Sequence, residues 1–456
     1  MTTARFLLTF LAAAPALAAQ QAGLTLSQAV DGALRNYPAI QVSQEQVNAA
    51  AAGIRLARTA YLPRVDTIAT VNRATRNNVF GLLLPQSVIP SMSGPVIGSN
   101  NTGTAWGSAL GGLVAWEPFD FGLRQANVAV AEAAKTQQEA ALKRTRYDIA
   151  VATADAFLTL AAAQETVRAA QAGVDRAETV LQSVRALVEA ELRPGADSAR
   201  AEAEAAAART QLAQARQGTG VARANLSRFV GVDPAQISIV MARLLDLPAG
   251  QAPAAPDTAA NPLVVEQNAV VEQVRAQLGA LERSYFPRFS LQGAAYARGT
   301  GAETNGTLLG GVNGLAPTVQ NFAVGFTVTF PVMDKPAIEA REAVQAANMR
   351  AQTARAQQIA TDLRAQWNVA VANLQGARQV AANVPVQVAA GRAAASQAAA
   401  RYRSGLGNID DVAEADRLVT QAEIDDSLAR LSVWRGLLGL AAAAGDIQPF
   451  VAEVGQ

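Results

Sequence analysis

The chain contains two copies of one unit, and this internal repeat constrains the fold more than any other feature. The stretch from Pro38 to Arg64 has a counterpart from Pro262 to Arg288, about 224 positions later, and both end in Tyr-x-Pro-Arg. Further on, aspartates and glycines recur at a shared spacing of about 214: Asp120 with Asp334, Asp197 with Asp411, and Gly231 with Gly445. A repeat of this length decides the architecture before any local pattern does. We therefore expect two similar units, each with a long helical section and a short non-helical insert.

Composition excludes several classes of function. The 456 residues include no cysteine and no histidine, and 38 basic residues balance 37 acidic ones. Balanced charge argues against a nucleic-acid partner, which requires a basic face. The missing residue types are the commonest metal ligands and nucleophile–base partners. An enzyme is therefore disfavoured, and neither a cofactor nor a metal is predicted.

The N-terminus resembles a secretory signal. Arg5 precedes the apolar run Phe6–Leu11, and Ala16-Leu17-Ala18 has the small-x-small pattern of a cleavage site, which predicts a signal peptide over residues 1–18. An ordinary buried helix is the alternative. No cysteine follows the cleavage site, so no lipid anchor is predicted there. No later stretch reaches the roughly 18 apolar residues of a spanning helix, so a membrane location would require a β-barrel.

Each copy is predicted to form a long helical hairpin. The stretch 123–192 contains no proline and would extend on the order of 100 Å as a helix. Its counterpart, 337–403, contains Pro385, which predicts a bend or break near Asn383. Shorter returning helices are expected over residues 198–229 and 411–440.

The inserts are predicted to be strand pairs, at about 64–120 and 288–331. The clearest strand alternates large apolar residues with small or polar ones, which is typical of a strand with one apolar and one wet face. Aromatic residues near the strand ends suggest the girdle of a membrane barrel; the edge of a soluble sandwich is the alternative. The predicted lipid-facing residues are Phe322, Val324, Phe326, Val328 and Phe330, and the predicted girdle is Trp106, Trp116 and Tyr296.

These elements define the expected organisation. Residues 19–231 form the first repeat, 232–261 a proline-rich linker, 262–445 the second repeat and 446–456 a short tail. Four strands per chain leave open sheet edges, which cannot face lipid. Two chains would supply eight strands around a filled lumen, whereas three would supply twelve around an open bore. The small residues on the second strand face favour three.

In this order, the residues resemble the TolC-like outer-membrane efflux proteins over essentially the whole mature chain. The matching motifs, several of them duplicated, are Tyr61-Leu62-Pro63, Trp116-Glu117-Pro118-Phe119-Asp120-Phe121-Gly122, and Tyr402-Arg403-Ser404-Gly405 followed by Asp411-Val412. The resemblance implies a homotrimer with a twelve-stranded barrel in outer-membrane lipid and a helical tunnel in the periplasm. It also implies an exit duct for an efflux or type I secretion system, with a periplasmic adaptor and an inner-membrane transporter as partners.

The resemblance further implies a gate at the periplasmic tip. Carried over by position, the gate and constriction residues are Asp197, Tyr402, Asp411 and Glu414. The arginine that some family members use would fall at Gly407, so that link is absent. Asp197 and Asp411 could instead simply cap the returning helices. Arg193, Arg403 and Asp410 are expected either to be solvated or to contact the adaptor.

A second reading of the function is a periplasmic coiled-coil adaptor or scaffold without a pore. The strand inserts with their long Gly/Asn-rich loops argue against it, because an adaptor of this kind carries lipoyl-type domains.

Overall fold

The computed structural model describes residues 23–75, 103–248, 257–303 and 307–455, so the predicted signal peptide lies outside the described residues. The chain divides into two compact units. The described parts of Met1–Val42, Lys143–Leu263 and Ile359–Gln456 form unit 1, and those of Ser43–Leu142 and Val264–Gln358 form unit 2. Each unit therefore combines segments from both copies of the repeat.

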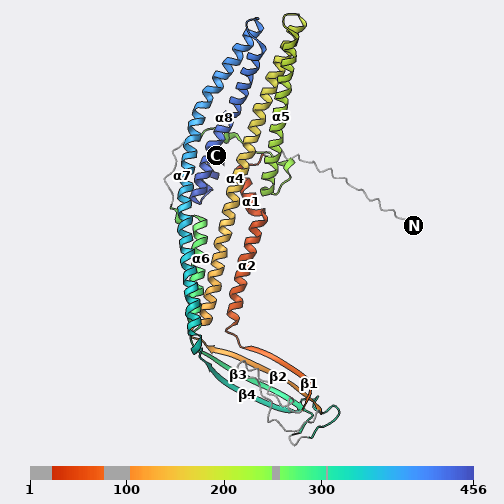
Figure 1. Ribbon diagram of the computed structural model, residues 1–456, viewed down its shortest axis with the longest axis vertical. Coiled ribbons are helices and arrows are strands. Elements are labelled where there is room, and N and C mark those ends of the chain that lie inside the picture. The colour runs from red at the N-terminus through yellow and green to blue at the C-terminus, as the bar shows by residue number, and fades with distance from the viewer. Residues whose placement is uncertain (1–22, 76–102, 249–256, 304–306, 456) are drawn as a thin grey trace, which may run out of the picture. The chain divides into compact units, whose positions relative to one another are not determined.

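The helices and strands follow the order expected for a duplicated unit (Figure 1). The first copy contains α1 (Leu26–Asn36), α2 (Pro38–Thr59), β1 (Arg64–Thr75), β2 (Thr104–Phe119), α4 (Leu123–Glu189) and α5 (Gly195–Val230). The second contains α6 (Pro262–Arg283), β3 (Arg288–Thr300), β4 (Val319–Thr329), α7 (Lys335–Arg403) and α8 (Ile409–Ala444). Short 3-10 helices connect them, and a last helix follows: η1 (Pro234–Gln236), η2 (Ala242–Leu245), η3 (Thr258–Ala260), η4 (Val332–Asp334) and α9 (Gln448–Gly455). None of the helices in these described ranges is long and apolar enough to cross a membrane.

The two returning helices end in the same way, which supports the alignment of the copies. Gly231 follows α5 with φ of 75°, and Gly445 follows α8 with φ of 85°. This left-handed conformation is costly for residues with a Cβ and is the usual C-terminal cap of a helix. The glycines that recur in the sequence therefore mark equivalent helix ends.

The main core of unit 1 is built by helices from both copies. Fully buried side chains include Phe157 and Leu160 on α4, Leu226 on α5 and Trp434 on α8. The indole N–H of Trp434 donates to the carbonyl of Asp246 at 3.1 Å, which ties the segment between the copies to this core. Buried tryptophans usually need such a partner for their polar end.

The break expected near Asn383 is absent, because α7 continues through Pro385 to Arg403. A proline inside a helix costs about 3 kcal/mol. Here the flanking residues are packed: Ala381 and Val384 are buried in a cluster with Val433 of α8. Burial of this apolar face offsets the missing hydrogen bond and keeps the segment helical.

Unit 2 contains one antiparallel sheet with the strand order β1-β2-β3-β4. Figure 1 shows the four strands side by side, with β1 and β4 at the two edges. The first and second strand pairs are joined through β2 and β3, where Leu110 faces Ala297 and Val114 faces Gly293. The two inserts of the repeat therefore form a single sheet.

Asp120, which recurs as Asp334, and the first Tyr-x-Pro motif meet where the sheet connects to the helices of unit 2. Asp120 accepts hydrogen bonds from the backbone N–H of Gly122 at 3.2 Å and of Arg124 at 2.7 Å. It also pairs with the Arg124 guanidinium at 2.8 Å. Arg124 in turn lies 4.8 Å from the centre of the Tyr61 ring and donates to the carbonyl of Ala60 at 3.3 Å. The motif residues thus start α4 and hold it against the end of α2.

Candidate functional site at the helical tips

Four helices of unit 1 meet at two turns, residues 190–194 between α4 and α5 and residues 404–408 between α7 and α8. An apolar cluster lies beside these turns and joins the first hairpin (α4–α5) to the second (α7–α8): Leu181, Val184, Ala201, Ala205, Tyr402, Ile409 and Val412. The two hairpins of one chain therefore share a small core at their tips.

Tyr402 and Asp197, two of the predicted gate residues, are in direct contact. The Tyr402 hydroxyl donates to Oδ2 of Asp197 at 2.8 Å, and Tyr402 is only 3% exposed. Burial, together with this hydrogen bond, raises the pKa of Tyr402 to about 12. The hydroxyl therefore stays protonated and able to donate across the physiological pH range.

Asp411 and Glu414 lie apart from that link, on exposed positions of α8. The Glu414 side chain is 77% exposed and pairs with Arg417 at 3.6 Å. The structure therefore brings together two of the four predicted gate residues and leaves the other two exposed.

Neither aspartate caps its helix, contrary to the simpler interpretation of these residues. Asn408 is the N-cap of α8, and its side chain accepts from the backbone N–H of Asp411 at 2.9 Å. Pro194 occupies the N-cap of α5 without a side-chain hydrogen bond, and Asp197 lies in the first turn. A carboxylate in the first turn is still favoured by the helix dipole.

Arginine side chains make further contacts between the two hairpins. Arg193 donates to the carbonyls of Tyr402 and Gly407, and Arg200 pairs with Asp410 at 3.2 Å. Arg193 and Asp410 were expected to be solvated or to contact the adaptor; Arg193 binds within the chain, whereas the Asp410 side chain is 68% exposed and so is solvated as well as paired. Their spacing gave no signal, because helical periodicity does not show which long side chains reach a neighbouring hairpin.

A third arginine joins three helices farther from the turns. Arg176 on α4 pairs with Glu423 on α8 at 3.0 Å and donates to the Thr420 hydroxyl at 2.8 Å. Glu423 also pairs with Arg392 of α7 at 2.8 Å. Close approach here depends on Gly173, where a Cβ would lie 2.9 Å from the Thr420 hydroxyl oxygen.

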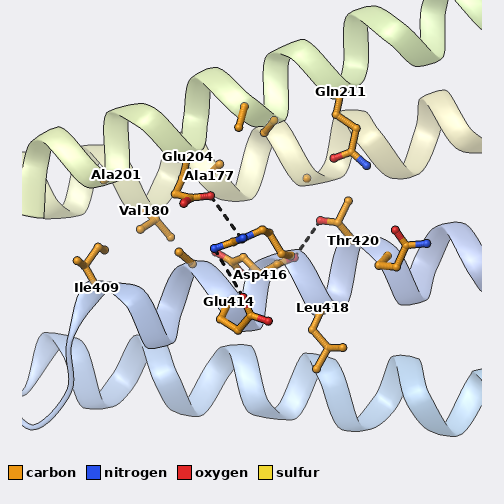
Figure 2. A pocket seen from close by; sticks show the side chains of 16 residues that line it. Ala177, Val180, Ala201, Glu204, Gln211, Ile409, Glu414, Asp416, Leu418 and Thr420 are labelled. Carbon is orange, nitrogen blue, oxygen red and sulfur yellow. Dashed lines mark hydrogen bonds and ion pairs between the residues drawn. The ribbon is translucent and has the colours of Figure 1, made fainter.

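A cavity of about 420 Å³ lies between α4, α5 and α8. In Figure 2, Glu204 of α5 and Asp416 of α8 lie across it from one another. Arg417 spans it to reach Glu204 at 3.5 Å. Burial raises the pKa of Asp416, and the nearby Arg176 partly opposes this shift. Within the described ranges, no group of three or more acidic side chains is arranged to hold a metal ion.

The sheet of unit 2 has one apolar and one polar face. Large apolar residues exposed on the first face occur on all four strands: Val65, Val71, Leu110, Val114, Trp116, Leu291, Phe322, Val324, Phe326 and Val328. Polar residues gather on the second: Arg64, Asp66, Thr70, Asn72, Ser290, Gln292, Asn321 and Thr327. The predicted strand face is therefore continuous across the sheet, and Phe330 follows directly after β4.

Tyr296 does not share a face with the two tryptophans of the predicted girdle. Trp106 and Trp116 lie on the apolar face of β2, whereas Tyr296 is the partner of Asn321 and Gly111 on the polar face. A Cβ at Gly111 would come within 2.2 Å of the Tyr296 Cβ. Closeness to a strand end does not determine which face a residue occupies, so a girdle role for Tyr296 would require a position on the opposite face from the two tryptophans.

Comparison with known proteins identifies the family. A family model described as outer membrane efflux protein matches residues 29–232 and 258–446, one segment on each copy of the repeat. The chain belongs to this family, since the match covers most of its length. It is thus an exit duct of the outer membrane. The alternative of a scaffold without a pore is not favoured.

Solved structures share the fold at low sequence identity. The Campylobacter jejuni CmeC outer membrane channel is 16% identical with a TM-score of 0.73, over 94% of this chain and 89% of that one. VceC from Vibrio cholerae is 16% identical with a TM-score of 0.71, over 92% and 96%. A membrane protein from Pseudomonas aeruginosa is 19% identical with a TM-score of 0.74, over 92% and 90%. No curated protein matches the sequence.

Proposed function

We propose that three copies of the chain join their sheets edge to edge into a closed twelve-stranded barrel, and that their helices form a tunnel through the periplasm. The observation that carries this proposal is the two-faced sheet, which exposes apolar side chains on every strand and ends at β1 and β4. An open sheet edge leaves backbone groups without partners, which is too costly in lipid. Twelve strands leave an open bore, whereas eight enclose a lumen filled by side chains.

The apolar face has the height of a membrane. Trp106 and Trp116 lie on the same face of β2, ten positions apart, which corresponds to about 34 Å along a strand. At a strand tilt of about 40°, this distance covers about 26 Å of membrane thickness, close to the roughly 25 Å apolar band of such barrels. We assign the two tryptophans to the two interfaces, with Phe322, Val324, Phe326 and Val328 facing lipid between or near them.

The tips are proposed as the docking site for a periplasmic adaptor that connects the duct to an inner-membrane transporter. Leu192 and Leu406 occupy equivalent positions of the two turns and are 69% and 75% exposed. A docked adaptor would cover this pair of exposed leucines, which would then join a larger buried apolar surface.

The contact between Tyr402 and Asp197 is proposed to hold the tip closed. It links the two hairpins of a chain and would occur three times in the trimer. Asp411 and Glu414 would then form rings of carboxylates at the bore, where repeated negative charge in a narrow channel favours cations. Opening requires the hairpins to separate, and loss of the hydroxyl link to the Asp197 carboxylate removes about 1.5–3 kcal/mol per chain.

Conductance in planar bilayers tests the gate. Tyr402→Phe combined with Asp197→Ala should raise single-channel conductance, and Asp411→Asn with Glu414→Gln should reduce block by multivalent cations. Tyr147→Phe is the matched control, because the Tyr147 hydroxyl also joins two helices of unit 1, by donating to the carbonyl of Ala442, but lies far along α4 from the turn. Unchanged conductance and block in both gate variants would place the constriction elsewhere.

A further inference from the structure

Arg193 belongs to the first hairpin, but its side chain binds residues of the second. It lies in the turn between α4 and α5 and donates to the carbonyl oxygen of Gly407 at 3.2 Å and to that of Tyr402. Its guanidinium carbon lies 4.3 Å from the centre of the Tyr402 ring. Arg193 therefore contacts both ends of the turn between α7 and α8, and the Tyr402 side chain as well.

The two carbonyls are suited to a cation. Tyr402 is the next-to-last residue of α7, so its carbonyl is among those that the helix leaves without an intrahelical partner. The negative end of the helix dipole also lies there, and a positive side chain is favoured at that position. One N–H, that of Gly405, reaches the Tyr402 carbonyl at 3.1 Å, and a carbonyl oxygen can accept two hydrogen bonds.

The same contacts fix the aromatic ring of the gate. Arg193 lies over the face of Tyr402, while Asp197 accepts from its hydroxyl at 2.8 Å. Arg193 and Asp197 lie four positions apart at the start of the first hairpin's returning segment. Both hydrogen bonds come from one guanidinium nitrogen, Nη2, whereas the stacking of the planar guanidinium on the ring face is a property that lysine does not reproduce. The tyrosine is thus held from two sides by neighbouring residues of one hairpin.

The repeat explains why the first hairpin donates this contact and the second hairpin accepts it. Arg193 and Gly407 occupy equivalent positions of the two copies, 214 residues apart. The first copy therefore supplies the guanidinium, and the second supplies a glycine whose carbonyl oxygen accepts a hydrogen bond from it. At Gly407, a Cβ would lie 3.3 Å from the Arg401 Cβ and from the Tyr402 backbone nitrogen, so the second turn is tightly folded where the guanidinium binds. The reverse contact cannot form, because Gly407 has no side chain.

We propose that Arg193 is the positioning residue that fastens the second hairpin to the first when the tip is closed, which rests on the gate proposed above. In this arrangement, release of Arg193 loosens the turn 404–408, which stays joined to the first hairpin through the Tyr402–Asp197 hydrogen bond and the Arg200–Asp410 ion pair. The turn then carries the exposed Leu406 with it.

Distances between the turns test the proposal without relying on transport. The chain has no cysteine, so cysteines placed at Leu192 and Leu406 carry the only spin labels, and dilution with unlabelled chain isolates the distance within one protomer. We expect Arg193→Met to shift the distribution to longer and broader distances, with roughly tenfold more of the separated form per protomer, as expected for the loss of a charge-assisted contact. Arg193→Lys should be intermediate.

Arg185→Met is the matched control, because Arg185 pairs with Glu202 at 3.3 Å within the first hairpin. It should leave the distance distribution as in the parent. An unchanged distribution in Arg193→Met would overturn the proposal for Arg193. A changed distribution with unchanged conductance would instead retain the fastening role and reject the tip as the gate.

Discussion

Substitution of Phe322 by arginine is the sharpest test of the membrane face. The side chain is 86% exposed on β4. Its row across the sheet contains Ala295 and Gly112, and Gly112 lies between the tryptophans of β2, six positions from Trp106 and four from Trp116. Phe322 is therefore near the middle of the apolar band. A charged residue there should cost about 2–4 kcal/mol per chain, or about 6–12 kcal/mol for a trimer.

The structure supplies two comparisons for this variant. Phe326 belongs to the row of Leu291 and Trp116, near the interface, so Phe326→Arg should cost less. Thr327 lies on the opposite face, paired with Ser290, and Thr327→Arg should be tolerated. The measurement is the temperature at which the detergent-solubilised trimer dissociates, read by heat-modifiable migration on gels. An equal fall in dissociation temperature for Phe322→Arg and Thr327→Arg would refute the assignment of the two faces. An equal fall for Phe322→Arg and Phe326→Arg would refute the assignment of Phe322 to the middle of the apolar band.

Two further predictions concern the helices of unit 1. Gly436→Ala should lower the thermal unfolding midpoint measured by circular dichroism, because a Cβ there would lie 2.9 Å from the Leu374 Cα and overpacking costs about 1–3 kcal/mol of stability. Gly376→Ala is the control: the space around Gly376 is open, so this variant should gain up to about 1 kcal/mol of stability. Stabilisation by both variants would contradict the contact between Gly436 and Leu374. Burial raises the pKa of Asp416 in the folded chain, so its contribution to stability is present at low pH and is lost as pH rises through that pKa. Asp416→Asn should therefore be more stable than the parent at pH 7 and equal to it near pH 3, and a difference that does not vary with pH would show that Asp416 is not desolvated.

The sequence predicted the duplicated architecture well, because repeats and periodicity are local properties of the chain. Gly231 and Gly445 recur in the sequence and both end helices in the left-handed conformation. The alternation from Phe322 to Val328 placed those residues on one face, which the strand pairing confirms. The pairing of Tyr402 with Asp197 could be anticipated only from the resemblance to a family, since 205 positions separate the two residues.

The errors arose where tertiary contacts override local preference. Pro385 remains inside a helix because its neighbours are packed against α8. Asn408, rather than Asp411, occupies the N-cap of α8, and composition alone did not distinguish these two good capping residues. The role of Arg193 depends on which way a long side chain turns between hairpins, and no periodic pattern encodes that direction.

The two turns at the tips differ in stiffness, although they descend from one repeated unit. Glu191 adopts a left-handed φ of 58° at the position where the second turn has Gly405 with φ of 84°, and the first turn continues with Pro194 where the second has Asn408. Glycine adopts this conformation freely, and proline restricts the chain. We therefore expect the first hairpin to stay in place during opening and the second hairpin to move. In the proposed trimer, three moving second hairpins would alternate with three fixed first hairpins around the axis, and the aperture would widen as the second hairpins move outward.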